Sequence, residues 1–271
     1  MINNQKFCTI ISYHYVRNLS SSAYPKIKGL DVLSFQHQLD YFQEYYELIT
    51  IEDCIDAIYS DKDIPSNSLL LTFDDGYIDH YDIVFPILKE RGIQGCFFPQ
   101  GKAISESKVL DVNKIHFILA KVNEFDLLIE DIFLLMDKYR LDYKLQANSF
   151  YYNKLALKNR YDEEEVMFVK KLLQKELDVE LRGKITDELF YKHVTKDEAS
   201  FSKELYMNVT QLKQMKNQGM VIGSHSYNHF WLNTLSEREQ IKEINLSLSF
   251  LEDLEIPRNN WVMCYPYGSY N

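Results

Sequence analysis

The chain has 271 residues, 46% of them hydrophobic and 26% charged, which is an ordinary globular composition with enough apolar material for a sizeable core. Its formal net charge of −10 disfavours contact with phosphate backbones, which argues against nucleic acid as the main partner. Residues 1–6 lack the apolar segment of a secretory signal, and no stretch reaches the roughly 18 apolar residues of a membrane span. We therefore expect a cytoplasmic protein without a transmembrane segment, which can still lie at the membrane periphery.

The first hundred residues alternate between strand and helix patterns. Strands are predicted where β-branched and apolar residues run together, at residues 7–13, 47–50, 68–73 and 94–98. Helices are predicted where apolar residues recur every three or four positions, at residues 34–46, 50–58 and 81–91. Ser34 is the candidate N-cap of the first helix, Thr50 with Asp53 resembles a capping signal for the second, and Gly92 ends the third.

The pattern changes over residues 104–205, where apolar residues fall at helical spacing and Gly and Pro are almost absent. We interpret this stretch as a helical insertion within a single domain covering residues 1–271. The alternation then resumes with a helix ending near Gly219, a strand at residues 220–224, a helix capped by Ser236 and a final strand at residues 261–264. Strands alternating with helices predict a parallel sheet or barrel.

Chemically active residue types cluster directly after the predicted strands. The clusters are Tyr-His-Tyr at residues 13–15, Thr-Phe-Asp-Asp-Gly at 72–76, His-Ser-Tyr-Asn-His at 225–229 and Pro-Tyr-Gly at 266–268. In barrel enzymes the catalytic groups come from the carboxyl ends of strands, so segments far apart in sequence meet there. Taken separately, each motif has a structural alternative: an Asp-Gly or Pro-Tyr-Gly turn, or a histidine pair without a metal. Two adjacent carboxylates, however, are costly at a strand end unless a cation neutralises them.

Together and in this order, the last three motifs resemble those of the NodB-homology polysaccharide deacetylases, carbohydrate esterase family 4. The resemblance covers residues 7–103 and 206–271, and residues 11–58 look like the branch that acts on poly-N-acetylglucosamine. It implies an α/β fold, a distorted (β/α) barrel. We expect this barrel to be incomplete at the C-terminus, because about six strands are predicted where the family has seven or eight.

The resemblance also implies a chemistry. Asp75, His225 and His229 would bind one divalent metal, with Zn²⁺ expected and Co²⁺, Ni²⁺, Mn²⁺ or Fe²⁺ as alternatives. Asp74 would be the general base, and the backbone N–H of Tyr267 would donate to the oxyanion. The implied activity is hydrolysis of a C–N bond other than a peptide bond, removing N-acetyl groups from a glycan or its lipid-linked precursor.

Two departures from the family pattern keep other readings open. The family's general acid is a histidine of a later motif, expected beyond Asn271, so His14 is the candidate for this role within the chain, with a core histidine as the alternative. Cys264 stands where many members carry an arginine that orients the base. These departures favour a non-catalytic carbohydrate-binding relative as one alternative, and a metal amidohydrolase acting on a small amide is another.

Aromatic residues near the third motif are candidate substrate contacts. Tyr265, Pro266 and Trp231 are the residues we assign to glycan binding, and apolar packing is the alternative for each. The identity of the glycan and the oligomeric state stay open at this level.

Overall fold

The computed structural model describes residues 7–60, 62–258 and 261–270; the N-terminal segment discussed above, residues 1–6, lies outside the described residues. The chain divides into two compact units. The sheet unit comprises Met1–Leu19, Gly29–Lys108 and Ser202–Asn271, and the helical unit comprises Ser20–Lys28 and Val109–Phe201. The assignment of residues 104–205 as an insertion in one domain stays a prediction.

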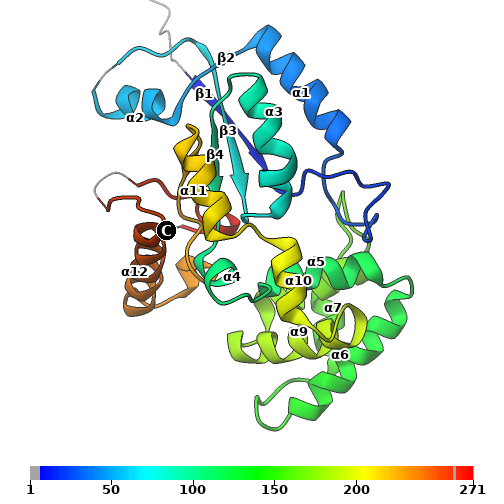
Figure 1. Cartoon of the computed structure of the whole chain (residues 1–271). Coiled ribbons are helices and arrows are strands. Elements are labelled where there is room, and N and C mark those ends of the chain that lie inside the picture. The colour runs from blue at the N-terminus through cyan, green and yellow to red at the C-terminus, as the bar shows by residue number, and fades with distance from the viewer. Residues whose placement is uncertain (1–6, 61, 259–260, 271) are drawn as a thin grey trace, which may run out of the picture. The chain divides into compact units, whose positions relative to one another are not determined.

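The sheet unit is built on a parallel sheet. Its strands are β1 (Phe7–Tyr13), β2 (Glu47–Leu48), β3 (Asn67–Asp74), β4 (Gly95–Phe98) and β5 (Val221–Ile222). The order is β1-β3-β4-β5, with β2 paired to the start of β3, and every pairing is parallel. Figure 1 shows β1, β3 and β4 running side by side. The α/β class predicted from the alternating pattern is confirmed.

Strand β3 lies at the centre of the sheet. All of its residues except Asn67 are buried, because β1 pairs on one side, β4 pairs on the other, and helices cover the faces. Three of its four leucine and phenylalanine side chains join one core cluster with Phe35 and Leu39 of helix α1 (Val32–Tyr45) and Leu88 of helix α3 (Phe85–Glu90). A continuous apolar run therefore positions the two aspartates that follow it.

Among the described residues, six α-helices lie entirely within the sheet unit. They are α1 (Val32–Tyr45), α2 (Ile51–Tyr59), α3 (Phe85–Glu90), α4 (Gly101–Ser105), α11 (Val209–Asn217) and α12 (Glu237–Asp253). A π-helical turn (His80–Val84) leads into α3. The predicted capping boxes at Thr50 and Ser236 are confirmed.

Two local predictions were wrong. The N-cap of α1 is Asp31, whose carboxylate accepts a hydrogen bond from Leu33 N–H at 3.0 Å, so Ser34 lies inside the helix. Residues 261–264 form a single parallel bridge, Ser224 with Met263, in place of a strand. Pairing stops there because Pro266 has no N–H to donate and Tyr267 turns the chain with a φ of 57°.

The helical unit holds α5 (Asp111–Lys121), α6 (Phe125–Tyr139), α7 (Asn148–Leu155), α8 (Glu164–Lys171) and α9 (Val179–His193), with a π-helical turn at Leu172–Glu176 and the start of α10 (Glu198–Leu205). Its interior includes Leu128, Ile132, Phe168 and Ile185, all fully buried. Of these, Leu128 and Ile132 are residues whose helical spacing in the sequence predicted a buried stripe. No helix among the described residues is both long and apolar enough to cross a lipid bilayer.

Candidate metal centre

The predicted motifs converge at the carboxyl ends of the strands. Asp74 is the last residue of β3 and Asp75 follows it, while His225 comes three residues after β5. Parallel strands end at one edge of a sheet, so residues more than a hundred positions apart meet there. This convergence was predicted from the strand-end rule.

Asp75, His225 and His229 form a compact buried group. Asp75 Oδ1 lies 3.6 Å from Nε2 of His229 and 3.8 Å from Nε2 of His225, and each residue is at most 8% exposed. Ligand atoms about 2.0–2.2 Å from a zinc ion in tetrahedral geometry lie about 3.3–3.6 Å apart. The spacing and the chemistry of the donors therefore fit a divalent metal.

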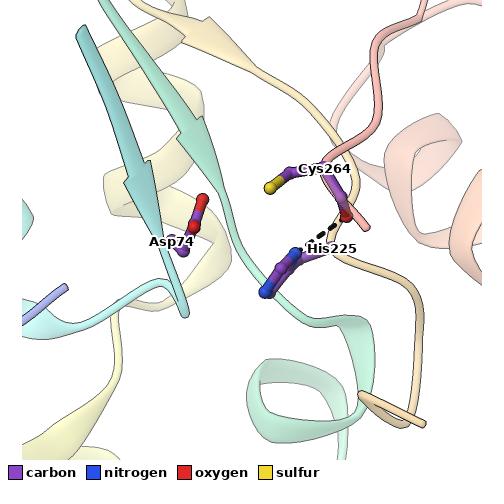
Figure 2. A group of neighbouring side chains, drawn as sticks. All are labelled: Asp74, His225 and Cys264. Carbon is purple, nitrogen blue, oxygen red and sulfur yellow. Dashed lines mark hydrogen bonds between the residues drawn. The ribbon is translucent and has the colours of Figure 1, made fainter. Parts of the chain in front are cut away.

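A backbone carbonyl sets the tautomer of His225. Nδ1–H of His225 donates to the carbonyl oxygen of Cys264 at 2.8 Å, the bond drawn dashed in Figure 2. With the proton on Nδ1, the lone pair of Nε2 faces Asp75. Histidines that bind metals are commonly oriented by such a bond from the other ring nitrogen.

Two left-handed residues shape the loop that carries the histidines. Ser226 and His229 both have a φ of 60°, a conformation that costs a residue with a side chain roughly 1–2 kcal/mol. Ser224 Oγ accepts from Ser226 N–H, and Ser226 Oγ accepts from His229 N–H, both at 3.1 Å. These bonds offset part of the strain and fix the spacing of the two imidazoles.

The aspartate pair ends in a glycine for a steric reason. Asp75 has a φ of 74° and Gly76 a φ of 65°. A Cβ on Gly76 would lie 2.7 Å from Cβ of Pro99, closer than packed carbon atoms approach. The Asp-Asp-Gly sequence is therefore required by the close approach of the segment after β4.

Asp75 is held by two further side chains. Tyr77 donates its hydroxyl to Oδ2 at 2.5 Å, and Nε2 of the fully buried Gln100 donates to Oδ1. Burial by itself raises the pKa of Asp75, but His229, His225, His14 and the Tyr77 hydroxyl outweigh burial and hold that pKa below its usual range. Gln100 was not recognised from the sequence, although it stands two residues after β4 and obeys the same strand-end rule.

The second aspartate has a different environment. Ser12 Oγ donates to Asp74 Oδ2 at 2.8 Å. Asp74 Oδ1 is buried, and no N–H or O–H of the described residues donates to it. Figure 2 shows Asp74 across from the Cys264 thiol and the His225 ring, and one potential ligand atom from each of the three lies within 4.8 Å of the others. Burial, followed by the charge of Asp74, raises the pKa of the Cys264 thiol to about 12, so the thiol is protonated.

His14 lies beside the same carboxylate. Its Nε2 is 4.0 Å from Asp74 Oδ2, and its side chain is 52% exposed. Its carbonyl oxygen accepts a 2.7 Å hydrogen bond from Nε2–H of buried His80, whose pKa burial lowers to about 4. His14 is thus an exposed residue at the edge of the site, and His80 supports it from the core.

The aromatic candidates gather on the side of His229. The ring of Tyr267 stacks on Trp231 with centroids 4.2 Å apart and planes 2° apart, and it meets the His229 ring edge to face at 4.6 Å. Tyr265 is half exposed and Pro266 is buried. The structure thus brings Trp231 and Tyr267 next to the histidines.

Comparison with known proteins identifies the family of the chain. The polysaccharide deacetylase family profile matches residues 61–122 and 189–271, which is more than half of the chain. The chain belongs to the polysaccharide deacetylase family, and the predicted NodB-homology resemblance is confirmed. A polysaccharide deacetylase relative, YxkH of Bacillus subtilis (strain 168), is 30% identical over 95 residues, a match that spans 35% of this chain and about a third (32%) of that protein.

Two solved structures share the fold. The Streptococcus pyogenes deacetylase PplD, in complex with acetate, has a TM-score of 0.53 at 16% identity over 97% of this chain and 75% of that one. A de-N-acetylase from Aggregatibacter actinomycetemcomitans has a TM-score of 0.51 at 14% identity, over 97% of this chain and 80% of that one. At these identities the similarity concerns the fold.

Proposed function

We propose that this protein is a metal-dependent hydrolase that removes N-acetyl groups from a glycan or from its lipid-linked precursor. The observation that carries the proposal is the buried set of Asp75, His225 and His229 with a second carboxylate, Asp74, directly beside it. Family membership supports the same activity.

Two imidazoles and a carboxylate suit Zn²⁺, with Co²⁺, Ni²⁺, Mn²⁺ or Fe²⁺ as alternatives. A cation held by Asp75, His225 and His229 would polarise the acetyl carbonyl and make a water molecule more acidic. Three protein ligands also leave coordination positions for water and substrate, which is typical of catalytic sites.

Asp74 is the proposed general base. Its Oδ1 is buried, and among the described residues no N–H or O–H donates to it, so it can accept a proton from the attacking water, while Ser12 holds Oδ2 in place. Many family members orient the base with an arginine, and Cys264 stands at that position here. In this proposal Ser12 orients Asp74 instead.

Tyr267 and His14 complete the proposed set. The backbone N–H of Tyr267 would donate to the developing oxyanion, a contribution of about 3 kcal/mol in comparable sites. His14, half exposed and 4.0 Å from Asp74, would return a proton to the leaving amine of the sugar. The role of Tyr267 follows from the resemblance to the family, and the role of His14 follows from its position beside Asp74.

The proposed substrate is an N-acetylated glycan of the poly-N-acetylglucosamine type. The stacked pair of Trp231 and Tyr267, with half-exposed Tyr265 nearby in sequence, offers flat apolar faces of the kind on which sugar rings pack. Pro266, which is buried, would shape this surface from beneath. The resemblance of residues 11–58 to that branch of the family supports the same substrate class.

Acetate release from N-acetylated oligosaccharides tests the proposal. Asp75→Ala and His225→Ala should each lower the rate by at least about a thousandfold, because each removes a metal ligand. His37→Ala, on the exposed face of α1, is the matched control and should leave the rate unchanged. Unchanged activity in both ligand variants would end the proposal.

The same assay separates the alternatives. A panel of small acetylated amides should be poor substrates, and faster turnover of these than of oligosaccharides would identify a small-amide hydrolase. Cys264 is the residue that favours a non-catalytic relative. Zinc binding and glycan affinity without any acetate release would assign the protein to that class.

A further inference from the structure

Helix α12 buries two polar side chains on the face that also carries its apolar core residues. Glu243 is 4% exposed and Ser247 1%, and they share that face with Phe250 and Leu251. Their four-residue spacing places them one above the other on the helix. A buried carboxylate is costly unless hydrogen bonds compensate for lost solvation, so this position requires an explanation.

Both side chains bind the loop that carries the histidines. Glu243 Oε2 accepts the backbone N–H of Asn228 at 2.9 Å, and its Oε1 accepts Nδ2–H of the same residue. Ser247 Oγ forms a hydrogen bond with Ser224 Oγ. Ser224 immediately precedes His225, and Asn228 immediately precedes His229. Each buried polar group of α12 is therefore attached one residue before a histidine of the metal centre.

Tyr227 lies between these two attachments and is held by helix α4. Lys102 N–H donates to the carbonyl oxygen of Tyr227 at 3.1 Å, and the Tyr227 hydroxyl donates to Glu106 at 3.0 Å. A Cβ on Gly101 would lie 2.4 Å from the Tyr227 ring, so the glycine permits this close packing. With Tyr227 fixed on α4, the bonds to α12 decide how the two ends of the loop are placed.

An ordinary packing role does not account for Glu243. A leucine would fill the same space without the cost of burying a charge, and among the described residues no lysine or arginine forms an ion pair with this carboxylate. Its two oxygens meet the two N–H donors of Asn228, a pairing that fixes both the backbone and the side chain of that residue.

We propose that Glu243, assisted by Ser247, is a positioning residue that sets the geometry of His225 and His229 for metal binding. This inference rests on the proposed function, since it presumes that these histidines bind the metal. Partners that orient metal ligands typically change metal affinity by about 10–100-fold when they are lost. The proposal predicts an effect of that size from a residue that touches no ligand atom.

Zinc affinity, measured by competition with a chromophoric chelator, is the first test and does not depend on turnover. Glu243→Leu should bind zinc about 10–100-fold more weakly than the unaltered protein. Ser247→Ala should also weaken zinc binding, but by a smaller factor. Glu237→Leu and Ser249→Ala, which change exposed positions of the same helix, should bind zinc as the unaltered protein does. Circular dichroism checks that each variant is folded.

A reciprocal pair of substitutions makes the test independent of folding losses. Asn228→Asp places two carboxylates opposite each other and should weaken zinc binding about 10–100-fold, although the added negative charge alone would strengthen it. Adding Glu243→Gln restores a donor facing an acceptor, so the double variant should recover to within about threefold of the original affinity. A double variant no better than Asn228→Asp alone overturns the positioning role.

Zinc binding by the variants distinguishes a wrong metal centre from a wrong role for Glu243. If His225→Ala binds zinc as tightly as the unaltered protein, the metal centre itself is wrong. If His225→Ala loses zinc while Glu243→Leu and Asn228→Asp keep it, only the role of Glu243 is overturned.

Discussion

Both units of the protein bury charged side chains, but they satisfy them in different ways. In the helical unit, the ammonium of Lys114 lies 2.5 Å from Asp187 and 2.9 Å from Glu198, so opposite charges neutralise each other directly. In the sheet unit, Asp75 lies 3.6 and 3.8 Å from the two imidazoles, which is too far for hydrogen bonds.

The difference distinguishes a structural ion pair from a candidate metal site. The lysine cluster is held by direct ion pairs, because the one ammonium contacts both carboxylates. The aspartate and imidazoles instead direct lone pairs toward a common point, and their geometry is maintained by groups behind them: Tyr77, Gln100 and the carbonyl of Cys264. This convergence without direct bonding is the reason why we propose the metal site in the sheet unit. Four experiments test this difference between the two units.

The largest effect is expected from Asp74→Asn. An amide cannot accept a proton at neutral pH, so kcat for acetate release should fall about 10²–10⁴-fold, while zinc content stays at one ion per chain. Asp82→Asn, on an exposed position after the same strand, is the control. A loss of zinc together with activity would show that Asp74 is a ligand rather than the base.

Removing the metal should lower the stability of the sheet unit and leave the stability of the helical unit unchanged. Zinc at about 100 times its dissociation constant adds about 2.7 kcal/mol to the stability of the state that binds it. Amide hydrogen exchange should therefore slow about 100-fold in β3 and around His225 when zinc is added, and stay unchanged in α6 and α8. Equal slowing in both units would contradict a site confined to the sheet unit.

Lys114→Met should lower the stability of the helical unit and leave the metal site unaffected. It removes a buried charge but leaves Asp187 well exposed and Glu198 partly exposed, so the cost should be about 1–2 kcal/mol, below the usual range for a fully buried pair. Urea unfolding measures the stability, and zinc affinity should be unaltered. Lys192→Met should change stability by less than about 0.5 kcal/mol, because the Lys192 side chain is 60% exposed.

The smallest effect is expected from Ser12→Ala. Removing the hydroxyl that donates to Asp74 should lower kcat about 5–10-fold with little change in KM, because one hydrogen bond of about 1 kcal/mol orients the base. Ser12→Thr keeps the hydroxyl and should recover most of the rate. Equal rates for the alanine and threonine variants would remove Ser12 from the site.

The sequence predicted those features that depend on local patterns. The buried run before Asp74 predicted β3, and the capping residues Thr50 and Ser236 predicted two helix starts, because the signals lie within a few residues of the structure that they specify. Ser34 failed because Asp31, three residues earlier, forms an equally good cap.

The supporting residues of the site could not be found in this way. Ser12, Gln100 and Glu243 are ordinary polar residues in their own segments, and only the folded chain brings them to Asp74, Asp75 and Asn228. The proposed metal ligands were recognisable because their order and spacing resemble a family, whereas the residues behind them carry no such pattern.

The position of the aspartate pair at the end of β3 limits how this gene can vary. Asp74 and Asp75 are consecutive, and the strand before them is paired on both sides. Deleting or inserting one residue in β3 would therefore turn each carboxylate toward the side to which its neighbour now points. The surface loops can accept changes in length, but the length of this strand is coupled to the chemistry at its end.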